Sequence, residues 1–349
     1  MTPTYAQQLL GRTLKDDWTV VEHIPRRADA TGGHFSESYI VQNPAGERAF
    51  LKALDFSEAL TSPDPARALQ PLTAAYNFER DLLFRCRDRR LDRVVVALDD
   101  GSVLVDTTSP AGVVQYLIFE LADGDIRKHL KIAAAFDLAW ALRSLHQVAI
   151  GITQLHANQI AHQDLKPSNV MVFGAKSSKV GDLGRAAAKG EQPPHEGFPV
   201  AGDRSYAPPE FLYGATPTDW APRRLGCDAY LLGSMQAFLF TGVGITSMWM
   251  AELDPQYHWK NWRGTFAEVL PYVRDAFGRA TTAFSATVPD EYRSELRTIL
   301  QQLCDPDPTL RGHPRNRASR GNQFGLERFV SAYNRLATQA ERGINKARS

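Results

Sequence analysis

The hydrophobic pattern of this chain changes once along its length, near residues 122–124, and that change limits the fold to one built from two different parts. Before this point apolar residues come in short runs typical of β-strands, and after it they recur at helical spacing. The turn sequence Asp99-Asp100-Gly101 also predicts a hairpin between two of the strands. We expect no strands after residue 124. The expected strands are Trp18–Ile24, Ser38–Gln42, Ala49–Leu54, Val94–Leu98, Ser102–Val105 and Val113–Phe119.

Helical spacing of apolar residues predicts three long helices. One of them, Ala66–Arg87, interrupts the strands, so the first part should be a small sheet with one helix. Another, Phe136–His156, opens a larger helical part, and a third near the end of the chain should pack an apolar stripe onto that part. The stripe consists of Leu326, Phe329, Val330, Tyr333 and Leu336. The predicted fold class is therefore α+β.

One segment is long and apolar enough to suggest a membrane helix. The 22 residues Ala229–Met250 carry no formal charge. Gly233, Gln236 and Gly244 dilute the apolarity, and Thr241-Gly242 is typical of a helix end. We therefore expect a buried central helix that ends near residue 241 and no membrane span.

Composition narrows the possible functions. The 349 residues are enough for two lobes, and 40 basic against 39 acidic side chains leave a net charge of +1. Such a chain has no overall field that would recruit nucleic acid or an anionic membrane. The arginine-rich stretch 311–320 lacks aromatic residues and is expected to be a solvated loop. Three widely spaced cysteines and no visible export signal favour a cytoplasmic location.

Two motifs in the helical part carry most of the functional information. Residues 162–169 read HQDLKPSN, and residues 181–184 read GDLG. Together they resemble the catalytic and metal-binding loops of protein kinases of the Ser/Thr type, with HQD in place of HRD and DLG in place of DFG. The resemblance, of a bacterial-like kind, covers about residues 14–340.

The resemblance implies a bilobal fold, with a small β-rich N-lobe carrying one helix and a larger α-helical C-lobe. The kinase domain would span residues 14–342, between an N-terminal extension, 1–13, and a C-terminal tail, 343–349. Its parts would be an N-lobe at 14–119, a hinge at 120–125 and a C-lobe at 126–342.

The same resemblance assigns roles in the two motifs. Asp164 would orient the acceptor hydroxyl and take its proton, and Lys166 would neutralise the migrating phosphoryl group. Asn169 and Asp182 would supply hard oxygen ligands to Mg²⁺ on the phosphates. The alternative is a polar loop with a buried histidine and a capping asparagine.

Lys52 stands in the apolar strand Ala49–Leu54, where a buried ammonium group needs an anion. In kinases the anions are the α- and β-phosphates of ATP and a helix glutamate, which by resemblance is Glu79. A solvated lysine at a strand edge is the alternative.

The phosphate lid is the least regular part of the pattern. The sequence TGGHFSES, residues 31–38, offers Gly32 and Gly33 with Phe35 at the tip, and it lacks the GxGxxG pattern. Its place before Lys52 favours a lid over the phosphates, and an ordinary hairpin turn is the alternative.

Residues 116–130 resemble the kinase hinge region. Phe119 would guard the back of the adenine pocket, and the backbone groups of Glu120 and Ala122 would bind adenine. Asp125 would accept a ribose hydroxyl. An ordinary strand end followed by a turn is the alternative for Asp125.

Residues 202–210, GDRSYAPPE, resemble the segment that positions a protein substrate in kinases. By resemblance Arg311 pairs with Glu210, and Asp228 anchors the backbone of the catalytic loop. Small-molecule kinases lack this substrate segment and the lysine at position 166, so the resemblance favours a protein acceptor.

The sequence differs from the usual protein kinase pattern at positions that bear on regulation. Gln163 replaces the arginine that gathers a phosphorylated activation loop in many kinases, and residues 185–204 contain no Ser, Thr or Tyr. We therefore expect activity that does not depend on activation-loop phosphorylation. Asp203 replaces a threonine and places a second carboxylate near Lys166, where it could sequester the lysine.

These observations predict an ATP- and Mg²⁺-dependent Ser/Thr protein kinase with a protein substrate. The weak glycine loop and Asp203 leave a nucleotide-binding pseudokinase or signalling scaffold as one alternative. A small-molecule kinase is the second.

Overall fold

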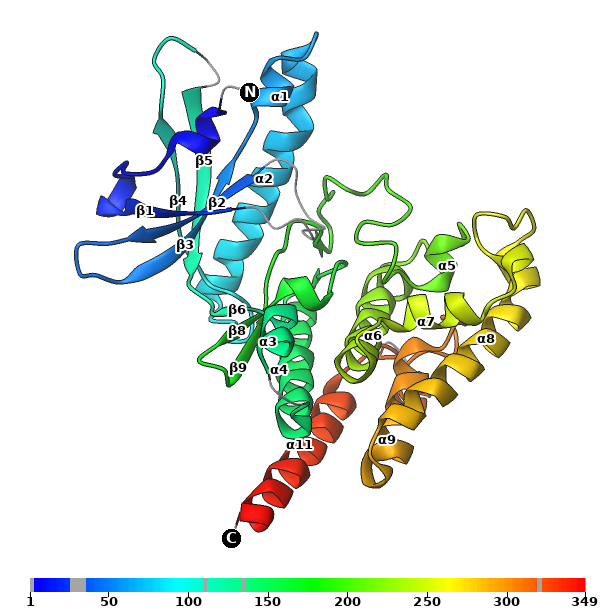
Figure 1. Ribbon diagram of the computed structural model, residues 1–349. Helices are drawn as coiled ribbons and strands as arrows, with labels where there is room; N and C mark the ends of the chain where they lie inside the picture. Colours follow the sequence, from blue (N-terminus) through cyan, green and yellow to red (C-terminus); the bar gives the residue numbers. More distant parts are fainter. Residues whose placement is uncertain (1–2, 26–35, 110–111, 134–135, 319–321, 349) are drawn as a thin grey trace. The chain divides into compact units, whose positions relative to one another are not determined.

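The computed structural model describes residues 3–25, 36–109, 112–133, 136–318 and 322–348, with side chains up to residue 343. The chain divides into two compact units, Met1–Asp123 and Gly124–Ser349. The first is a small antiparallel sheet with helices, called the N-lobe below, and the second is mainly helical, called the C-lobe (Figure 1). The predicted α+β class with a β-rich part followed by a helical part is confirmed. The predicted limits of the extension, lobes, hinge and tail stay predictions.

The N-lobe is built around a five-stranded antiparallel sheet with the strand order β1-β2-β3-β5-β4. Helix α2 lies beside the sheet (Figure 1). Pro65 at its first position and the Asp64 side chain, which accepts a hydrogen bond from the Arg67 N–H, start this helix. The elements are η1 (Tyr5–Gln8), η2 (Lys15–Asp17), β1 (Thr19–Ile24), β2 (Ser36–Gln42), β3 (Arg48–Leu54), α1 (Ser57–Leu60), α2 (Pro65–Asp88), β4 (Ala97–Leu104) and β5 (Val113–Glu120).

The predicted hairpin at Asp99-Asp100-Gly101 is wrong, because these residues lie inside the single strand β4. Asp99, Asp100 and Gly101 pair with consecutive residues of β5, and a register shift after Ala97 absorbs the irregularity. The Asp99 carboxylate is held by Lys15 at 2.9 Å and by the Asp100 N–H at 2.8 Å. Turn-forming residue types are therefore accommodated here by a bulge and by local bonds to Asp99.

The first residues of the chain contribute to the N-lobe core. Ala6 and Leu9 are buried in the same apolar cluster as Tyr39, Leu51 and Tyr116. The Tyr39 hydroxyl donates to the Ala6 carbonyl at 2.7 Å. Ala6 and Leu9, which belong to the predicted extension 1–13, are thus part of the core of this lobe.

The C-lobe is organised around α6, whose side chains are almost all buried. Helix α6 packs against α4, α8 and α9, and α11 lies along α4 (Figure 1). The predicted apolar stripe of the last helix is confirmed, since Phe329, Tyr333 and Leu336 are buried. The helices are α3 (Ile126–Ile132), α4 (Leu138–Ala157), η4 (Pro167–Asn169), α5 (Pro209–Leu212), η5 (Ala221–Leu225), α6 (Gly226–Thr241), α7 (Ile245–Glu252), η6 (Pro255–Tyr257), α8 (Phe266–Thr287), α9 (Asp290–Cys304), α10 (Pro314–Arg317) and α11 (Glu327–Arg348).

The uncharged segment forms a buried central helix, as expected. Helix α6 ends at Thr241 because Gly242 adopts the left-handed conformation with φ of 76°. Within the described residues no single helix is long and apolar enough to cross a membrane. Ala221–Thr241 and Ile245–Glu252 meet that test only as a pair, bent by 78°.

The expectation that strands stop after residue 124 is wrong, because the described residues of the C-lobe include five short strands. They form a three-stranded sheet of order β6-β8-β9 and the pair β10-β7. With two to four residues each, they are too short to show a periodic pattern in the sequence. They hold the two motif loops, one between β7 and β8 and the other between β9 and β10. The strands are β6 (Gly124–Asp125), β7 (Ile160–Ala161), β8 (Val170–Phe173), β9 (Ser177–Val180) and β10 (Ala187–Ala188).

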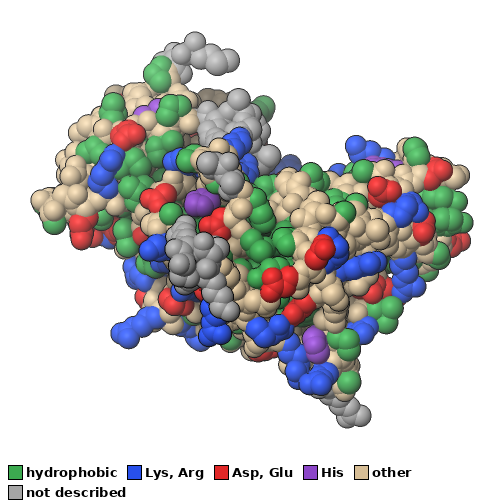
Figure 2. All heavy atoms as spheres, turned by 60° about the horizontal axis from the view of Figure 1, so that its bottom comes forward, with side chains coloured by type: hydrophobic (Ala, Val, Ile, Leu, Met, Phe, Trp, Pro, Cys, Tyr) green, Lys and Arg blue, Asp and Glu red, His purple; other side chains and the backbone are tan. Residues whose placement is uncertain are grey.

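Charged side chains on the surface agree with the near-zero net charge. Figure 2 shows Lys and Arg side chains interspersed with Asp and Glu over the visible face. This mixture offers no broad field of one sign on that face.

Candidate active site

The buried carboxylate of Asp228 on α6 holds the backbone of the loop 162–169. Asp228 accepts hydrogen bonds from the backbone N–H groups of His162, at 2.7 Å, and Gln163, at 2.8 Å. His162 also contacts the Gly181 carbonyl through Nε2, at 2.9 Å, which ties the loop to the start of the second motif. The anchoring role expected of Asp228 is confirmed.

Asp228 stays ionised although it is fully buried. Burial raises the pKa of this carboxyl, but the hydrogen bond and charge of His156, with the Gln163 N–H, lower the pKa overall. His156 Nε2 lies 2.9 Å from the carboxylate. Sequence analysis missed His156, because it lies on α4 and no local pattern links it to the loop.

Asp164, Lys166 and Asn169 form one buried cluster. The Lys166 ammonium lies 2.9 Å from Asp164 Oδ2. Asn169 Nδ2 donates to the Asp164 carbonyl at 2.8 Å and to Oδ2 at 3.2 Å. The Asp203 N–H donates to Asp164 Oδ1 at 2.8 Å. The structure therefore brings the predicted base, its neighbouring cation and one predicted metal ligand together.

The environment of Asp164 favours proton uptake. Burial raises its pKa, and the charge of Asp182 raises it further, while Lys166 and the Asp203 N–H act in the opposite direction. The net shift is upward, which suits a carboxylate that accepts a proton.

Gly202 is a further positioning residue of this cluster. A Cβ atom there would lie 2.5 Å from the Gln163 carbonyl oxygen and 2.6 Å from Asp164 Oδ1. Only glycine lets the segment approach closely enough for the Asp203 N–H to reach Asp164. Sequence analysis named Gly202 as part of the substrate segment and missed this contact.

Asp182 completes a set of oxygen donors that fits Mg²⁺. It adopts a left-handed backbone conformation with φ of 59°, and its Oδ1 accepts from the Gly184 N–H at 3.3 Å. Asn169 uses its Nδ2 toward Asp164, so its amide oxygen is the atom suited to a cation. Within the described residues there is no group of three His, Cys, Asp or Glu side chains arranged to hold a metal ion by themselves. A carboxylate and an amide oxygen, completed by phosphates and water, match the way Mg²⁺ is usually held.

Asp203 lies at the edge of the cluster. Its Oδ2 is 3.9 Å from the Lys166 ammonium, and its Oδ1 accepts from the backbone and the hydroxyl of Ser205, at 2.9 and 2.7 Å. Lys166 is thus held mainly by Asp164, with Asp203 as a second and more distant acid.

In the N-lobe, Lys52 and Glu79 are paired as the sequence predicts. The Lys52 ammonium on β3 lies 3.0 and 3.1 Å from the two carboxylate oxygens of Glu79 on α2. Strand β3 is an inner strand, between β2 and β5, and Glu79 is buried. A solvated lysine at a strand edge is therefore excluded.

The predicted nucleotide-binding residues are only partly described. Glu120 ends β5, where its carboxylate accepts from the Val96 N–H at 2.8 Å. Phe119 is buried beside Phe50, and Ala122 lies in the irregular stretch that follows β5. The predicted lid residues Gly32, Gly33 and Phe35 lie outside the described residues.

Asp125 has structural partners of its own. Its side chain caps α3 by accepting from the Lys128 N–H at 3.0 Å, and it pairs with Arg127 at 2.8 Å. The alternative of an ordinary turn with a capping residue describes these contacts. The ribose contact stays a prediction.

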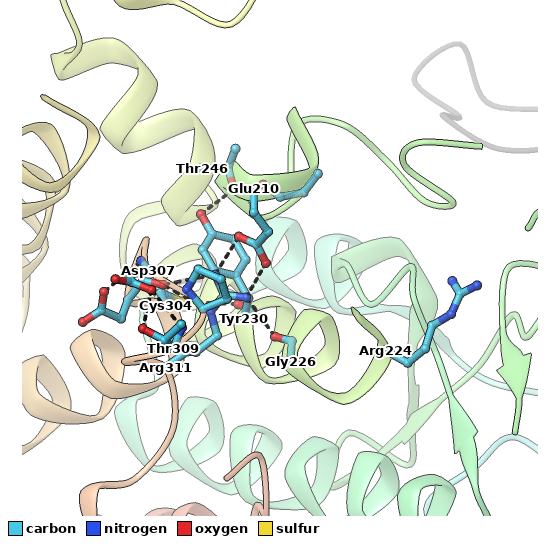
Figure 3. A network of polar contacts seen from close by, with 12 residues as sticks. Glu210, Arg224, Gly226, Tyr230, Thr246, Cys304, Asp307, Thr309 and Arg311 are labelled. Atoms are coloured by element: carbon cyan, nitrogen blue, oxygen red, sulfur yellow. Dashed lines mark hydrogen bonds and ion pairs between the residues drawn. The ribbon is translucent and has the colours of Figure 1, made fainter. Parts of the chain in front are cut away.

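The Glu210–Arg311 pair expected near the substrate segment is present (Figure 3). Arg311, from the loop after α9, also donates to the carbonyls of Asp305 and Gly226 and lies over the Tyr230 ring. Burial lowers the pKa of Arg311, but the Glu210 carboxylate raises it overall. The pair joins the end of the substrate segment to α6 and to the loop after α9.

Comparison with known families agrees with this geometry. The protein kinase domain model matches residues 105–318, more than half of the chain. The chain belongs to the protein kinase domain family. The kinase-type fold inferred from the two motifs is thereby confirmed, and the bacterial-like kind stays a prediction.

The curated proteins that resemble this chain include kinases of eukaryotes. The chain is 31% identical over 98 residues to an Aurora kinase of Debaryomyces hansenii, covering 28% of this chain and 24% of that protein. It is 36% identical over 107 residues to the serine/threonine-protein kinase SSN3 of Mycosarcoma maydis, covering 29% and 15%. It is 39% identical over 74 residues to cell division control protein 2 homolog 3 of Trypanosoma brucei brucei, covering 21% and 24%. The chain thus spans about a quarter or less of these three relatives.

Proposed function

We propose that this protein is an ATP- and Mg²⁺-dependent Ser/Thr protein kinase that transfers the γ-phosphate of ATP to a protein hydroxyl. The observation that carries the proposal is the buried cluster of Asp164, Lys166 and Asn169 on a loop anchored by Asp228. Family membership and the names of the relatives support the same reaction.

Each residue of the cluster has a task in the proposed reaction. Asp164 accepts the proton of the acceptor hydroxyl as the new oxygen–phosphorus bond forms and the bond to ADP breaks. Lys166 balances the charge of the transferred phosphoryl group, and Asn169 holds Asp164 in place through its amide N–H. Asn169 and Asp182 would hold Mg²⁺, which when bound neutralises phosphate charge. Lys52, kept in place by Glu79, would bind the α- and β-phosphates.

A protein acceptor is favoured over a small molecule. Residues 202–210, the segment that resembles the protein-substrate segment of kinases, end in Glu210, which is held by the buried Arg311. By resemblance, Lys166 and Pro167 favour Ser and Thr over Tyr as acceptors. A cytoplasmic location stays a prediction.

The proposed kinase works without phosphorylation of its activation segment. Residues 185–204 contain no hydroxyl side chain, and Gln163 cannot bind a phosphate as arginine does. Mass spectrometry that found a phosphate required for activity between Leu183 and Ser205 would refute this part.

The decisive experiment measures γ-phosphate transfer to the protein itself and to a generic basic protein. Asp164→Asn should lower transfer by about 10²- to 10⁴-fold, because it removes the general base. Asp290→Asn, which alters an exposed acid on α9, serves as the matched control and should keep full transfer. Equal rates for wild type and Asp164→Asn would remove the role assigned to Asp164.

The same experiment separates the alternatives. Thermal stabilisation by ATP without any transfer would indicate a nucleotide-binding scaffold, for which Asp203 near Lys166 is the structural argument. Transfer to a metabolite with proteins left unmodified would indicate a small-molecule kinase.

A further inference from the structure

A carboxylate of the activation segment, residues 185–204, is bound by two adjacent arginines. Arg223 Nη1 lies 2.5 Å from Glu196 Oε1, and Arg223 Nη2 donates to the Glu196 carbonyl at 3.1 Å. Arg224 Nη2 forms an ion pair and hydrogen bond with Glu196 Oε2. Glu196, Arg223 and Arg224 are called the carboxylate latch below.

The carboxylate latch is connected directly to the catalytic loop. Arg224 Nη1 donates to the Gln163 amide oxygen at 3.2 Å, and Gln163 Nε2 donates to the Arg224 carbonyl at 2.9 Å and to Asp228 at 3.0 Å. Asp228 in turn fixes the backbone of the loop that carries Asp164. A continuous set of hydrogen bonds therefore runs from Glu196 to the backbone next to Asp164.

The Glu196 carboxylate compensates the positive charge of Arg223 and Arg224. The Arg224 side chain is only 6% exposed and lies next to Arg223. Burial lowers the pKa of Arg224, and the like charge of Arg223 lowers it further, while Glu196 acts in the opposite direction. Two neighbouring guanidinium groups, one of them buried, require an anion, and Glu196 supplies it.

Neighbouring contacts hold the same segment at other points. His195 contacts the Gly184 carbonyl at 2.8 Å and Arg185 at 2.8 Å. The Lys189 N–H donates to the Gln159 carbonyl at 2.9 Å, next to the pair β10-β7. Hydrogen bonds thus join the two ends of the stretch 184–196 to each other and join its middle to Gln159, and none of them involves a phosphate.

We propose that Glu196 is a positioning residue that replaces an activation-segment phosphate, with Arg223 and Arg224 as its receptor. The proposal rests on the proposed kinase function. A phosphate on such a segment acts by pairing with arginines that touch the catalytic loop. Here a fixed carboxylate makes that contact, so the catalytic loop is held in its ordered form as soon as the chain has folded.

The test uses the full chain and two readouts. Glu196→Gln keeps the shape of the side chain and removes its charge, and Glu196→Asp keeps the charge on a shorter stem. Glu295→Gln breaks a surface carboxylate–arginine pair with Arg335 elsewhere in the C-lobe and serves as the matched control. The readouts are amide hydrogen exchange over residues 185–204 and steady-state phosphate transfer.

We expect Glu196→Gln to speed exchange in residues 185–204 about tenfold or more, because charged hydrogen bonds are among the stronger ones. It should lower kcat by a similar factor while KM for ATP stays within about twofold, because the latch acts on the catalytic loop. Compared with Glu196→Gln, Glu196→Asp should show slower exchange in residues 185–204 and a higher kcat. Glu295→Gln should behave as wild type.

The two proposals fail in different ways. A wild-type protein without transfer would overturn the kinase function, whereas exchange over 185–204 would still test the latch. Unchanged exchange and kcat in Glu196→Gln would overturn the latch.

A second experiment applies if Glu196→Gln fails to fold. Wild type is then compared at about 0.05 and about 0.5 M KCl, since the Glu196 side chain is 37% exposed and salt can screen it. Faster exchange at high salt in residues 185–204, and not in α6, is expected, and no difference would overturn the proposal.

Discussion

Arg311 donates two parallel hydrogen bonds to the carboxylate of Glu210, at 2.7 and 2.8 Å, and neither side chain is exposed to solvent. The two residues are 101 positions apart in the chain. Their pair connects residues 202–210, the segment proposed to position a protein substrate, to the helical core, so the position of that segment depends on a buried contact. Breaking one half leaves the other charge without compensation.

Arg311→Met should therefore lower the free energy of unfolding by about 3 to 5 kcal/mol, because the Glu210 carboxylate stays buried without its partner. Urea denaturation followed by circular dichroism measures the change. The control Arg335→Met removes an exposed pair with Glu295 and should cost about 1 kcal/mol or less. Equal losses for the two variants would contradict the distinction between buried and exposed pairs.

A substitution at Gly101 tests whether residues 99–101 lie inside strand β4. In strand β4 a Cβ atom at Gly101 would lie 2.5 Å from the Tyr116 hydroxyl and 2.7 Å from the Tyr116 ring. Gly101→Ala should destabilise the chain by about 1 to 3 kcal/mol, because the buried ring must move. Were residues 99–101 an exposed hairpin turn, the same change would be nearly neutral.

The matched control is Gly278→Ala in α8, where a Cβ atom meets nothing within 4 Å. Alanine inside a helix favours folding over glycine, so this variant should gain about 0.5 to 1 kcal/mol. Thermal unfolding of the two variants in parallel gives the comparison. A stable Gly101→Ala variant would show that Tyr116 leaves room at this position.

Residues whose role depends on a local pattern were predicted well from the sequence. Lys52 stands in a regular strand and Glu79 on a regular helix, and the two meet as expected. The helix end at Thr241 followed from the glycine after it. Glu210 and Arg311 were paired through the resemblance to kinases, since a separation of 101 residues carries no period that would reveal a contact.

Residues whose role depends on tertiary contacts or on irregular backbone were missed. Glu196 and Arg224 are 28 positions apart, and neither lies in a regular repeat. The bulge at Asp99 hides a continuous strand behind a turn sequence, because the pairing with β5 outweighs the local preference. The short C-lobe strands are likewise fixed by their partners.

The anchoring of the catalytic loop leads to a prediction about turnover. Asp228→Asn leaves one oxygen to accept from two backbone N–H groups, those of His162 and Gln163, and removes a buried charge paired with His156. We expect kcat for phosphate transfer to fall by about 10- to 100-fold, because Asp164 is no longer held in place.

Loss of stability alone should not reproduce that effect. Ser144→Ala breaks a buried hydrogen bond of 2.9 Å between Ser144 on α4 and Ser178 on β9, and neither residue belongs to the loop 162–169. It should lower the melting temperature while kcat, measured well below melting, stays near the wild-type value. A comparable fall in kcat in both variants would argue against a specific role for Asp228.

The activation segment should also respond to acid through His195. Burial lowers the pKa of this imidazole from its usual 6.5, and the charge of Arg185 lowers it further, while the Gly184 carbonyl acts in the opposite direction. In the neutral ring Nδ1 accepts from Arg185 and Nε2 donates to Gly184. A proton on Nδ1 would place two cations face to face.

Proton binding decides whether His195 stabilises or destabilises the fold as the pH falls. As the pH falls through 6.5, the unfolded chain binds a proton at His195 before the folded one does, so this residue destabilises the fold toward acid and has no effect well above pH 6.5. His195→Gln can make both hydrogen bonds at any pH. Intrinsic amide exchange slows toward acid, so the two proteins are compared by protection factors, the intrinsic rate at each pH divided by the observed rate. Between about pH 7.5 and about pH 5.5, the protection of residues 185–204 should therefore fall more in wild type than in His195→Gln. Because His258 and His313 titrate in both proteins, an equal loss of protection in the two would show that His195 is not the responsible group.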